Sequence, residues 1–166
     1  MIISRGVLLA ALLAISPVAA ASLEQAAEST VIDGPQVPVA PEVVTRDAEG
    51  HITVRAIRLT EPLRVDGELD EAVYQSELPI SDFVQLEPVA GTPATERTEA
   101  WVMFDAENIY VSARCWDSAP PDQWTANEMR RDSGQLLQND TFGMYFDTYY
   151  DRRNAFVFYA NPLGGF

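Results

Sequence analysis

The stretch that decides the fold is Asn139–Pro162, which has the sequence NDTFGMYFDTYYDRRNAFVFYANP. Large apolar side chains occupy every second position from Phe142 to Phe146, and Ala155–Ala160 has the same period of two. The polar run Asp151–Asn154 separates the two halves. Apolar runs of period two around a polar turn are typical of a β-hairpin. The stretch therefore predicts two antiparallel strands.

The second of these strands is apolar on both faces, because Phe156 and Phe158 alternate with Val157 and Tyr159. Such a strand is typical of the middle of a sheet or sandwich. Burying one Phe side chain stabilises a fold by about 1.5–3 kcal/mol. We therefore expect a central strand here and a core that contains four phenylalanines, Phe142, Phe146, Phe156 and Phe158.

The bulk composition limits the classes of function. The chain has 166 residues, 47% of them hydrophobic and 22% charged, which indicates one globular domain with extensions. A net charge of −14 argues against nucleic-acid binding and against adhesion to anionic lipid. Every basic side chain is Arg, and the sequence contains no Lys.

Cysteine and histidine occur once each, as Cys115 and His51. One cysteine excludes an internal disulfide, and its place in an apolar strand predicts a buried, inert thiol. One histidine in a polar stretch excludes a catalytic His pair and a metal site with several His ligands.

Residues 1–21 have the pattern of a secretory signal peptide. Arg5 gives the positive charge, Val7–Ile15 is a short apolar run, and Ala19-Ala20-Ala21 offers small residues for cleavage. The segment predicts export to the periplasm or beyond.

Residues 22–51 are expected to form a linker rich in Pro, Ala and Glu. Pro35, Pro38 and Pro41 are spaced by three, which favours an extended polyproline conformation. The domain itself is expected over 52–166.

The remaining elements follow from periodicity and turn residues. A strand is expected over Ile52–Leu59, a short helix over 68–75 and a short strand over Phe83–Leu86. A second hairpin joins Thr98–Phe104 to Ile109–Trp116, and a further short helix lies within 125–138.

Carboxylates are the first candidates for chemistry. Glycoside hydrolysis needs two of them across a cleft, and the least arbitrary choices are at strand ends: Asp117, Asp132, Asp140 and Asp147. The same residues are also typical caps of turns. Asp140 and Asp147 are also the candidate ligands for a structural calcium ion, although neither lies in an EF-hand pattern.

Sugar binding has a different signature, in which exposed aromatic rings contact a pyranose and polar groups bind its hydroxyls. The candidate rings are Trp101, Trp116 and Trp124, each of which could also be a packing residue. Arg130 and Arg131 could supply the polar rim near Trp124.

Several motifs in order resemble the carbohydrate-binding module family 9-like domain. They are Val65–Ala72, Thr98–Asp105 with Ile109-Tyr110-Val111, Arg131-Asp132, Asn139-Asp140, and the run from Phe146-Asp147-Thr148 through Asp151-Arg152-Arg153 and Phe158 to Asn161-Pro162-Leu163-Gly164. The likeness spans roughly residues 56–166. Tyr74 stands where the family often has Trp, and Asn139 where Asp is common.

The resemblance implies an all-β fold, an antiparallel β-sandwich of jelly-roll type that is incomplete at its C-terminal side. It also implies binding of oligo- or polysaccharide through aromatic rings, often with a bound calcium. The larger protein would be exported to the periplasm or outer membrane of a Gram-negative bacterium. It would act in polysaccharide breakdown, with hydrolase activity on O-glycosyl compounds, and would carry a downstream outer-membrane β-barrel region.

Two alternatives stay open beside a binding module. One is a glycoside hydrolase whose carboxylates lie in this chain. The other is a structural periplasmic domain of an outer-membrane β-barrel protein that binds no sugar.

Overall fold

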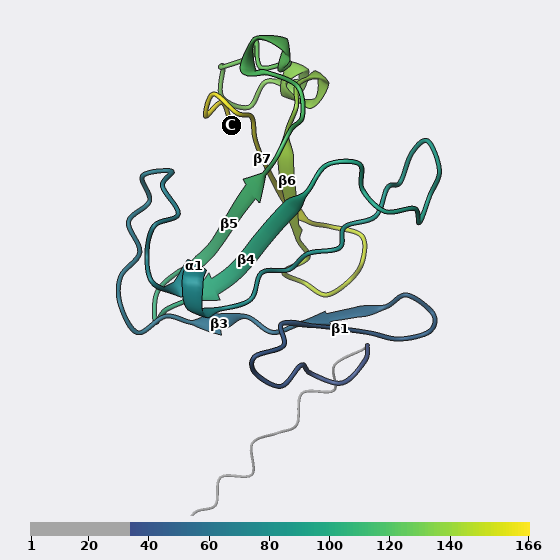
Figure 1. Cartoon of the computed structure of the whole chain (residues 1–166), viewed down its shortest axis with the longest axis vertical. Helices are drawn as coiled ribbons and strands as arrows, with labels where there is room; N and C mark the ends of the chain where they lie inside the picture. The colour runs from purple at the N-terminus through teal and green to yellow at the C-terminus, as the bar shows by residue number, and fades with distance from the viewer. Residues whose placement is uncertain (1–33) are drawn as a thin grey trace, which may run out of the picture. The chain divides into compact units, whose positions relative to one another are not determined.

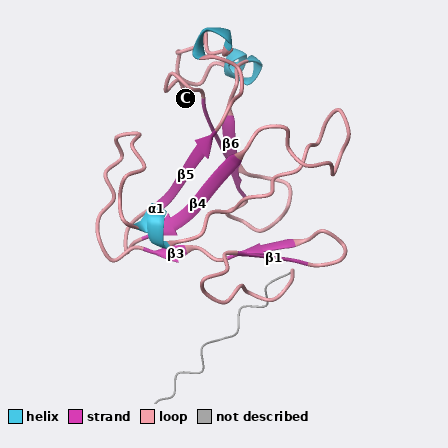
Figure 2. Cartoon of the chain, viewed as in Figure 1, coloured by secondary structure: helices cyan, strands magenta, loops and turns pink. Residues whose placement is uncertain are grey.

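The computed structural model of the chain describes residues 34–166 (Figure 1). The expected signal peptide, residues 1–21, lies outside the described residues, as does the first part of the expected linker. Among the described residues, those in strands outnumber those in helices, 26% against 9%, which confirms an all-β fold (Figure 2). Within 34–166, no helix combines the length and the apolar character that crossing a membrane requires.

The main sheet has three strands in the order β3-β4-β5. β4 (Thr98–Phe104) pairs antiparallel with β5 (Ile109–Cys115) and parallel with β3 (Ile57–Arg58). Ile80 adds a bridge to Ala100 on the β3 side. β4 is therefore the central strand of the sheet, and β5 is an edge.

The turn between β4 and β5 depends on Asp105. Its carboxylate accepts hydrogen bonds from the backbone N–H groups of Glu107 (2.8 Å) and Asn108 (2.7 Å) and from the hydroxyl of Tyr110 (2.8 Å). The bonds from Glu107, Tyr110 and Asn108 favour the charged form and lower the pKa of Asp105 from 3.8 to about 2. The turn confirms the predicted second hairpin.

β1 (Val44–Arg46) lies in the stretch expected to be a linker and pairs antiparallel with β2 (Ile52–Val54), the first strand of the expected domain. The expectation of an extended spacer is therefore wrong at β1. The β-branched residues around Val44 pair with those of β2, and the hydroxyl of Thr53 donates to the carbonyl of Pro35 (2.7 Å). The expected single strand over 52–59 is divided into β2 and β3.

The core lies between the main sheet and the segment 59–76. Ile57, Trp101 and Met103 are its buried members, with exposed fractions of 5%, 1% and 0%. The partly buried residues that pack on them are Leu59, Leu63, Leu69, Val73, Tyr74 and Tyr110. The helix in this segment, α1 (Val73–Ser76), is shorter than the predicted 68–75.

β6 (Phe142–Phe146) and β7 (Phe156–Ala160) form the predicted hairpin, but as a separate two-stranded sheet. The expectation that β7 is a central strand is wrong, because its hydrogen-bonded neighbour is β6 alone within residues 34–166. Phe156 and Phe158 are 58% and 53% exposed, and Phe142 and Phe146 are half-buried. The expected phenylalanine core is therefore not the core of this structure.

The connection from β5 to β6 holds two short 3-10 helices, η1 (Pro121–Gln123) and η2 (Gly134–Gln138). η2 lies where a short helix was expected.

Cys115 is exposed at the last position of the edge strand β5, so the expectation of a buried thiol is wrong. Phe83–Leu86 forms a single bridge, Val84 to Pro93, instead of a strand.

Candidate functional site

One face of the β4–β5 pair carries a row of cross-strand pairs. Glu99 lies opposite Arg114, Trp101 opposite Ser112, and Met103 opposite Tyr110. The N–H of Trp116 donates to the carbonyl of Arg97 (2.9 Å), which extends the pairing beyond the first residue of β4. Because side chains alternate along a strand, these pairs share one face of the sheet.

The inner end of this face is closed by the core. The ring of Trp101 meets the ring of Tyr74 edge to face, with 5.2 Å between centroids, and its indole N–H donates to the carbonyl of Glu77 (3.2 Å). At 1% exposure, Trp101 has no ring face left for a sugar. Trp101 is thus a packing residue, and its place among the candidate sugar-binding rings is corrected.

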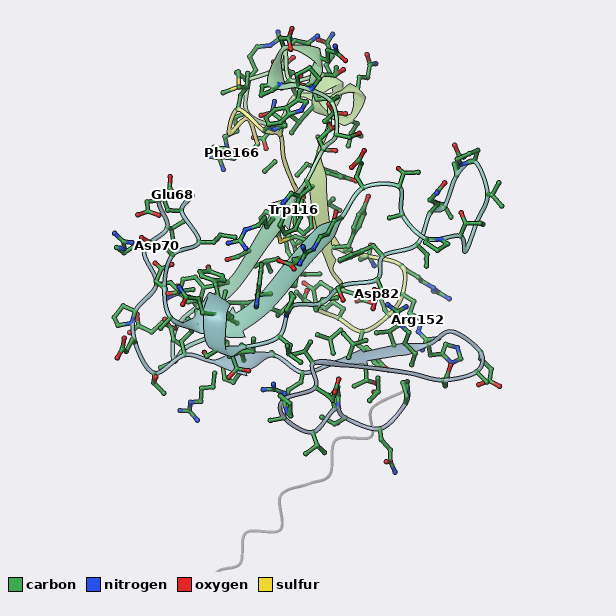
Figure 3. The ribbon with its side chains drawn as sticks, in the orientation of Figure 1. Glu68, Asp70, Asp82, Trp116, Arg152 and Phe166 are labelled. Atoms are coloured by element: carbon green, nitrogen blue, oxygen red, sulfur yellow. The ribbon has the colours of Figure 1, made fainter. Side chains whose placement is uncertain are left out.

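The outer end of the same face is open at Trp116, which is 37% exposed (Figure 3). The guanidinium carbon of Arg97 lies 4.4 Å from the centroid of the Trp116 ring, and that of Arg114 lies 5.8 Å away. Both distances are within the range of cation–π attraction. The two arginines therefore hold the indole ring at the end of the sheet.

Glu99 lies between the two arginines and is buried, with 7% exposure. Its carboxylate accepts a hydrogen bond from Nη2 of Arg97 and lies 3.8 Å from Nη1 of Arg114. A buried carboxylate requires such partners, because removing a charge from water is costly. We call Arg97, Glu99, Arg114 and Trp116 the Trp116 cluster.

Trp124 lies in the loop that follows Trp116 and is 36% exposed. Its indole N–H donates to the carbonyl of Ala119 (3.0 Å), which holds the ring against its own loop. The hydroxyl of Ser118 donates to the carboxylate of Glu96 (2.5 Å), which ties the same loop to the start of β4. Trp124 is therefore a partly exposed ring in a loop with fixed ends.

Arg130 is held by the carboxylate of Glu128. Its Nε and Nη2 atoms lie 3.1 and 2.8 Å from the two carboxylate oxygens, and its backbone N–H also donates to Glu128 (2.8 Å). These bonds, together with one from the hydroxyl of Ser133, lower the pKa of Glu128 from 4.5 to about 2. The first role of Arg130 is therefore to neutralise a carboxylate that is only 5% exposed.

Arg131 has a different setting. Its side chain is 74% exposed, its Nε lies 3.5 Å from the carboxylate of Asp132, and its guanidinium carbon lies 5.4 Å from the ring centroid of Phe166. Surface ion pairs of this kind contribute little to stability. Arg131 therefore remains available as a hydrogen-bond donor at the surface.

Two asparagines organise the loop that carries these arginines. The side-chain oxygen of Asn139 accepts from the N–H groups of Asn127 (2.9 Å) and Glu128 (3.0 Å). The buried Asn161 donates to the carbonyl of Glu128 (2.8 Å) and accepts from the N–H of Gly165 (2.8 Å). The loop around Glu128 and the C-terminal turn are thereby joined.

The candidate calcium ligands Asp140 and Asp147 lie on opposite sides of β6 in the chain, and each holds a loop. Asp140 accepts from the N–H of Thr125 (2.7 Å), and Asp147 accepts from the N–H groups of Asp151 (3.2 Å) and Arg152 (2.7 Å). Within residues 34–166, no group of three His, Cys, Asp or Glu side chains is placed to hold a metal ion.

The other candidate carboxylates have similar roles. Asp117 accepts from the N–H of Ala119 (2.7 Å), and Asp132, at a positive φ of 58°, pairs with Arg131. His51 forms an exposed pair with Asp47 (2.8 Å) in the β1–β2 turn. These contacts are those of turns and surface pairs rather than of an assembled acid–base site.

Sequence reasoning missed three of the four members of the Trp116 cluster, namely Arg97, Glu99 and Arg114. The available signal was the register of the second hairpin. A turn over Asp105–Asn108 sets Glu99 opposite Arg114, and opposite charges at a cross-strand pair attract.

A scan against protein-family models, a search of curated proteins and a search of solved structures each found no match to this chain. The likeness to the carbohydrate-binding module family 9-like domain therefore stays a prediction that depends on the sequence motifs.

Proposed function

We propose that this chain is a carbohydrate-binding module of a larger exported protein that takes part in polysaccharide breakdown. The observation that carries the proposal is Trp116, a ring that is 37% exposed at the open end of the β4–β5 face. A pyranose places its C–H groups on such a ring, while nearby polar groups bind its hydroxyls. Arg97 and Arg114 supply those donors beside the ring.

Trp124 supplies a second partly exposed ring in the adjoining loop, and Arg131 an exposed donor further along the chain. In this proposal, the oligo- or polysaccharide contacts Trp116 first, and the loop that carries Trp124 extends the contact. Trp101 and Arg130 support the site through packing and ion pairing.

We further propose that the sheets belong to an antiparallel β-sandwich of jelly-roll type. In support, one pocket of about 440 Å³ is lined both by the main sheet (Val102, Phe104 and Ile109) and by Phe146 of β6. The layers of a sandwich pack their apolar faces against each other, so a pocket lined from both sheets supports this proposal. The parallel pairing of β3 with β4 is the exception to the antiparallel pattern.

Calorimetric titration of the chain with a panel of oligosaccharides tests the binding proposal. A stacked ring contributes about 1–3 kcal/mol, so Trp116→Ala should weaken binding at least about 5-fold, and Trp124→Ala should weaken it as well. Tyr149→Ala is the matched control, because Tyr149 is a 75% exposed aromatic side chain between β6 and β7. A glycan array without a single ligand for the folded protein would contradict the proposal.

Determining the N-terminal residue of the protein recovered from the producing cell tests the proposed export. We expect cleavage after Ala21, so that the mature chain begins at Ser22. Recovery of the intact N-terminus from the cytoplasm would contradict export.

Hydrolase activity on O-glycosyl compounds belongs, in this proposal, to the larger protein and not to this segment. Asp140 and Asp147 accept backbone hydrogen bonds, so Asp140→Asn and Asp147→Asn should leave its turnover unchanged. Loss of turnover in folded variants would favour the alternative of a hydrolase within this chain.

A structural calcium ion at the loops of Asp140 or Asp147 also remains a proposal. It is supported by the acidic, oxygen-rich character of these loops, which suits calcium. A rise in melting temperature with calcium chloride, reversed by EDTA, would support it, and an unchanged melting temperature would count against it.

The alternative function is a structural periplasmic domain of an outer-membrane protein that binds no sugar. The exposed apolar hairpin favours it, since Phe156, Val157 and Phe158 are 58%, 42% and 53% exposed. Exposed apolar patches often mark surfaces that contact other chains. If Phe158→Glu blocks assembly of the full-length protein while no oligosaccharide binds the wild type, the alternative is favoured.

A further inference from the structure

The Trp116 cluster differs in charge from the rest of the described chain. The protein carries a net charge of −14, and Arg64 pairs with three carboxylates, those of Asp66, Asp70 and Glu71. At the Trp116 cluster the guanidinium groups outnumber the carboxylates instead, because Arg97 and Arg114 share one carboxylate, that of Glu99. Among the ion pairs within residues 34–166, this is the one in which guanidinium groups outnumber carboxylates.

The excess charge is accessible. The side chain of Arg97 is 67% exposed and that of Arg114 is 42% exposed, while the carboxylate between them is buried. A guanidinium has five N–H donors in a planar fork, and Arg97 uses Nη2 for Glu99. Within residues 34–166, Nε and Nη1 of Arg97 donate no hydrogen bond to the protein, and the guanidinium lies beside the ring of Trp116.

The two acidic residues next to the cluster in sequence are already engaged. Glu96 accepts from the hydroxyl of Ser118 (2.5 Å), and Asp117 accepts from the N–H of Ala119 (2.7 Å). Both carboxylates thus hold the loop after β5 and are not paired with the guanidinium groups of the cluster.

We propose that the Trp116 cluster selects acidic sugars, with a uronic acid ring on Trp116 and its carboxylate on the guanidinium of Arg97. This inference rests on the proposed carbohydrate-binding function and names the class of sugar. A carboxylate fits the guanidinium fork through two parallel charge-assisted hydrogen bonds, which a neutral sugar cannot form. The pairing also offsets the repulsion that an anion meets on approaching a chain of this net charge.

The test compares matched ligands on the full chain by calorimetry. The ligands are uronate oligosaccharides built from galacturonate, glucuronate, mannuronate or guluronate. Each is paired with the neutral oligosaccharide obtained by reducing its carboxyl groups. Each titration is run with EDTA and repeated with calcium chloride in its place, so that contact through a calcium bridge is recognised. We expect at least one acidic member to bind about 10-fold or more tightly than its neutral partner. This preference should shrink as NaCl rises from about 0.05 M to about 0.5 M.

Arg97→Gln should remove most of that preference, and Arg97→Lys should restore only part of it, because Lys keeps the charge without the fork. Arg153→Gln is the matched control, since it removes one exposed positive charge between β6 and β7. Urea unfolding of each variant verifies that the fold is intact.

The outcomes separate the two proposals. Equal binding of acidic and neutral partners, or a preference that survives Arg97→Gln, overturns the selection of acidic sugars and leaves carbohydrate binding standing. Binding that appears only without EDTA also overturns the role of the guanidinium. Failure of every pair to bind overturns both proposals.

Discussion

Two tryptophans on the same face of β4 and β5 have different roles because of their positions along the strands. Trp101 lies in the middle of β4, where the segment 59–76 covers the sheet, and Trp116 lies just beyond the end of β5. The burial of the first stabilises the core, and the second keeps part of its ring exposed.

Trp101→Ala should lower the free energy of unfolding by about 3–5 kcal/mol, since it removes a buried ring and its hydrogen bond to Glu77. Trp116→Ala should cost about 1 kcal/mol, the scale of an exposed cation–π contact. Urea unfolding of both variants measures the difference. Equal costs would contradict this division of roles.

Glu128 is the carboxylate whose protonation should lower the stability of the fold most as the pH falls. Its pKa is about 2 in the folded chain, against 4.5 ordinarily, because of its bonds to Arg130 and Ser133. A lowered folded pKa means that the stabilisation is complete above about pH 4.5 and is lost as the pH falls towards 2.

Glu128→Gln should therefore flatten the fall of the urea midpoint between pH 4.5 and 2. Glu49→Gln, which removes an exposed carboxylate in the β1–β2 turn, is the control and should keep the slope of the wild type. A Glu128→Gln profile that overlays the wild-type profile would contradict the role of this carboxylate.

At the scale of elements, the loop between β5 and β6 is shaped by polar contacts more than by apolar packing. Asn139 accepts from the N–H of Glu128, and Asn161 donates to the carbonyl of Glu128 and accepts from the N–H of Gly165 in the C-terminal turn. The close approach of Gly165 to this loop is part of the arrangement, because a Cβ there would lie 2.6 Å from the carbonyl oxygen of Glu128.

Gly165→Ala should cost about 1–3 kcal/mol, because a backbone carbonyl cannot move aside as a flexible side chain can. Gly134→Ala in η2 is the matched control, since a Cβ there meets nothing within 4 Å. Chemical unfolding compares the two variants, and a neutral Gly165→Ala would show that the turn is loosely packed.

At the scale of the whole molecule, the main core cluster within residues 34–166 is small and lies on one side of the main sheet. Its fully buried large side chains are Trp101 and Met103. The β6–β7 hairpin adds a half-buried Phe146 to the pocket on the other side but leaves Phe156 and Phe158 exposed.

Phe156→Ala should consequently cost about 1 kcal/mol or less, far below the cost of Trp101→Ala. Thermal and urea unfolding measure both variants. A cost for Phe156→Ala that matches the cost for Trp101→Ala would mean that the hairpin is buried in solution, as it would be by association of chains.

Local patterns were enough to predict the elements that depend on neighbouring residues. The two long hairpins form where period-two runs flank polar turns, and the Asp105 turn fixes the register that brings Glu99 opposite Arg114. The helix over 68–75 was predicted too long, because the α-helical hydrogen bonds there begin only near Val73.

Burial could not be predicted in the same way. Phe156, Phe158 and Trp101 are all large, apolar and in strands with alternating patterns, yet the first two are exposed and the third is buried. Which faces are covered depends on where distant segments lie, and the segment 59–76 covers β4 instead of β7.

The sequence by itself determined the all-β class, the two long hairpins, and the acidic charge that argues against nucleic-acid binding, since these follow from local periodicity and composition. The tertiary structure decided which tryptophan is core and which is exposed, and it placed two arginines and one buried glutamate around Trp116. The physical reason is that burial and ion pairing depend on contacts between residues far apart in the chain, as between β4 and the segment around Tyr74.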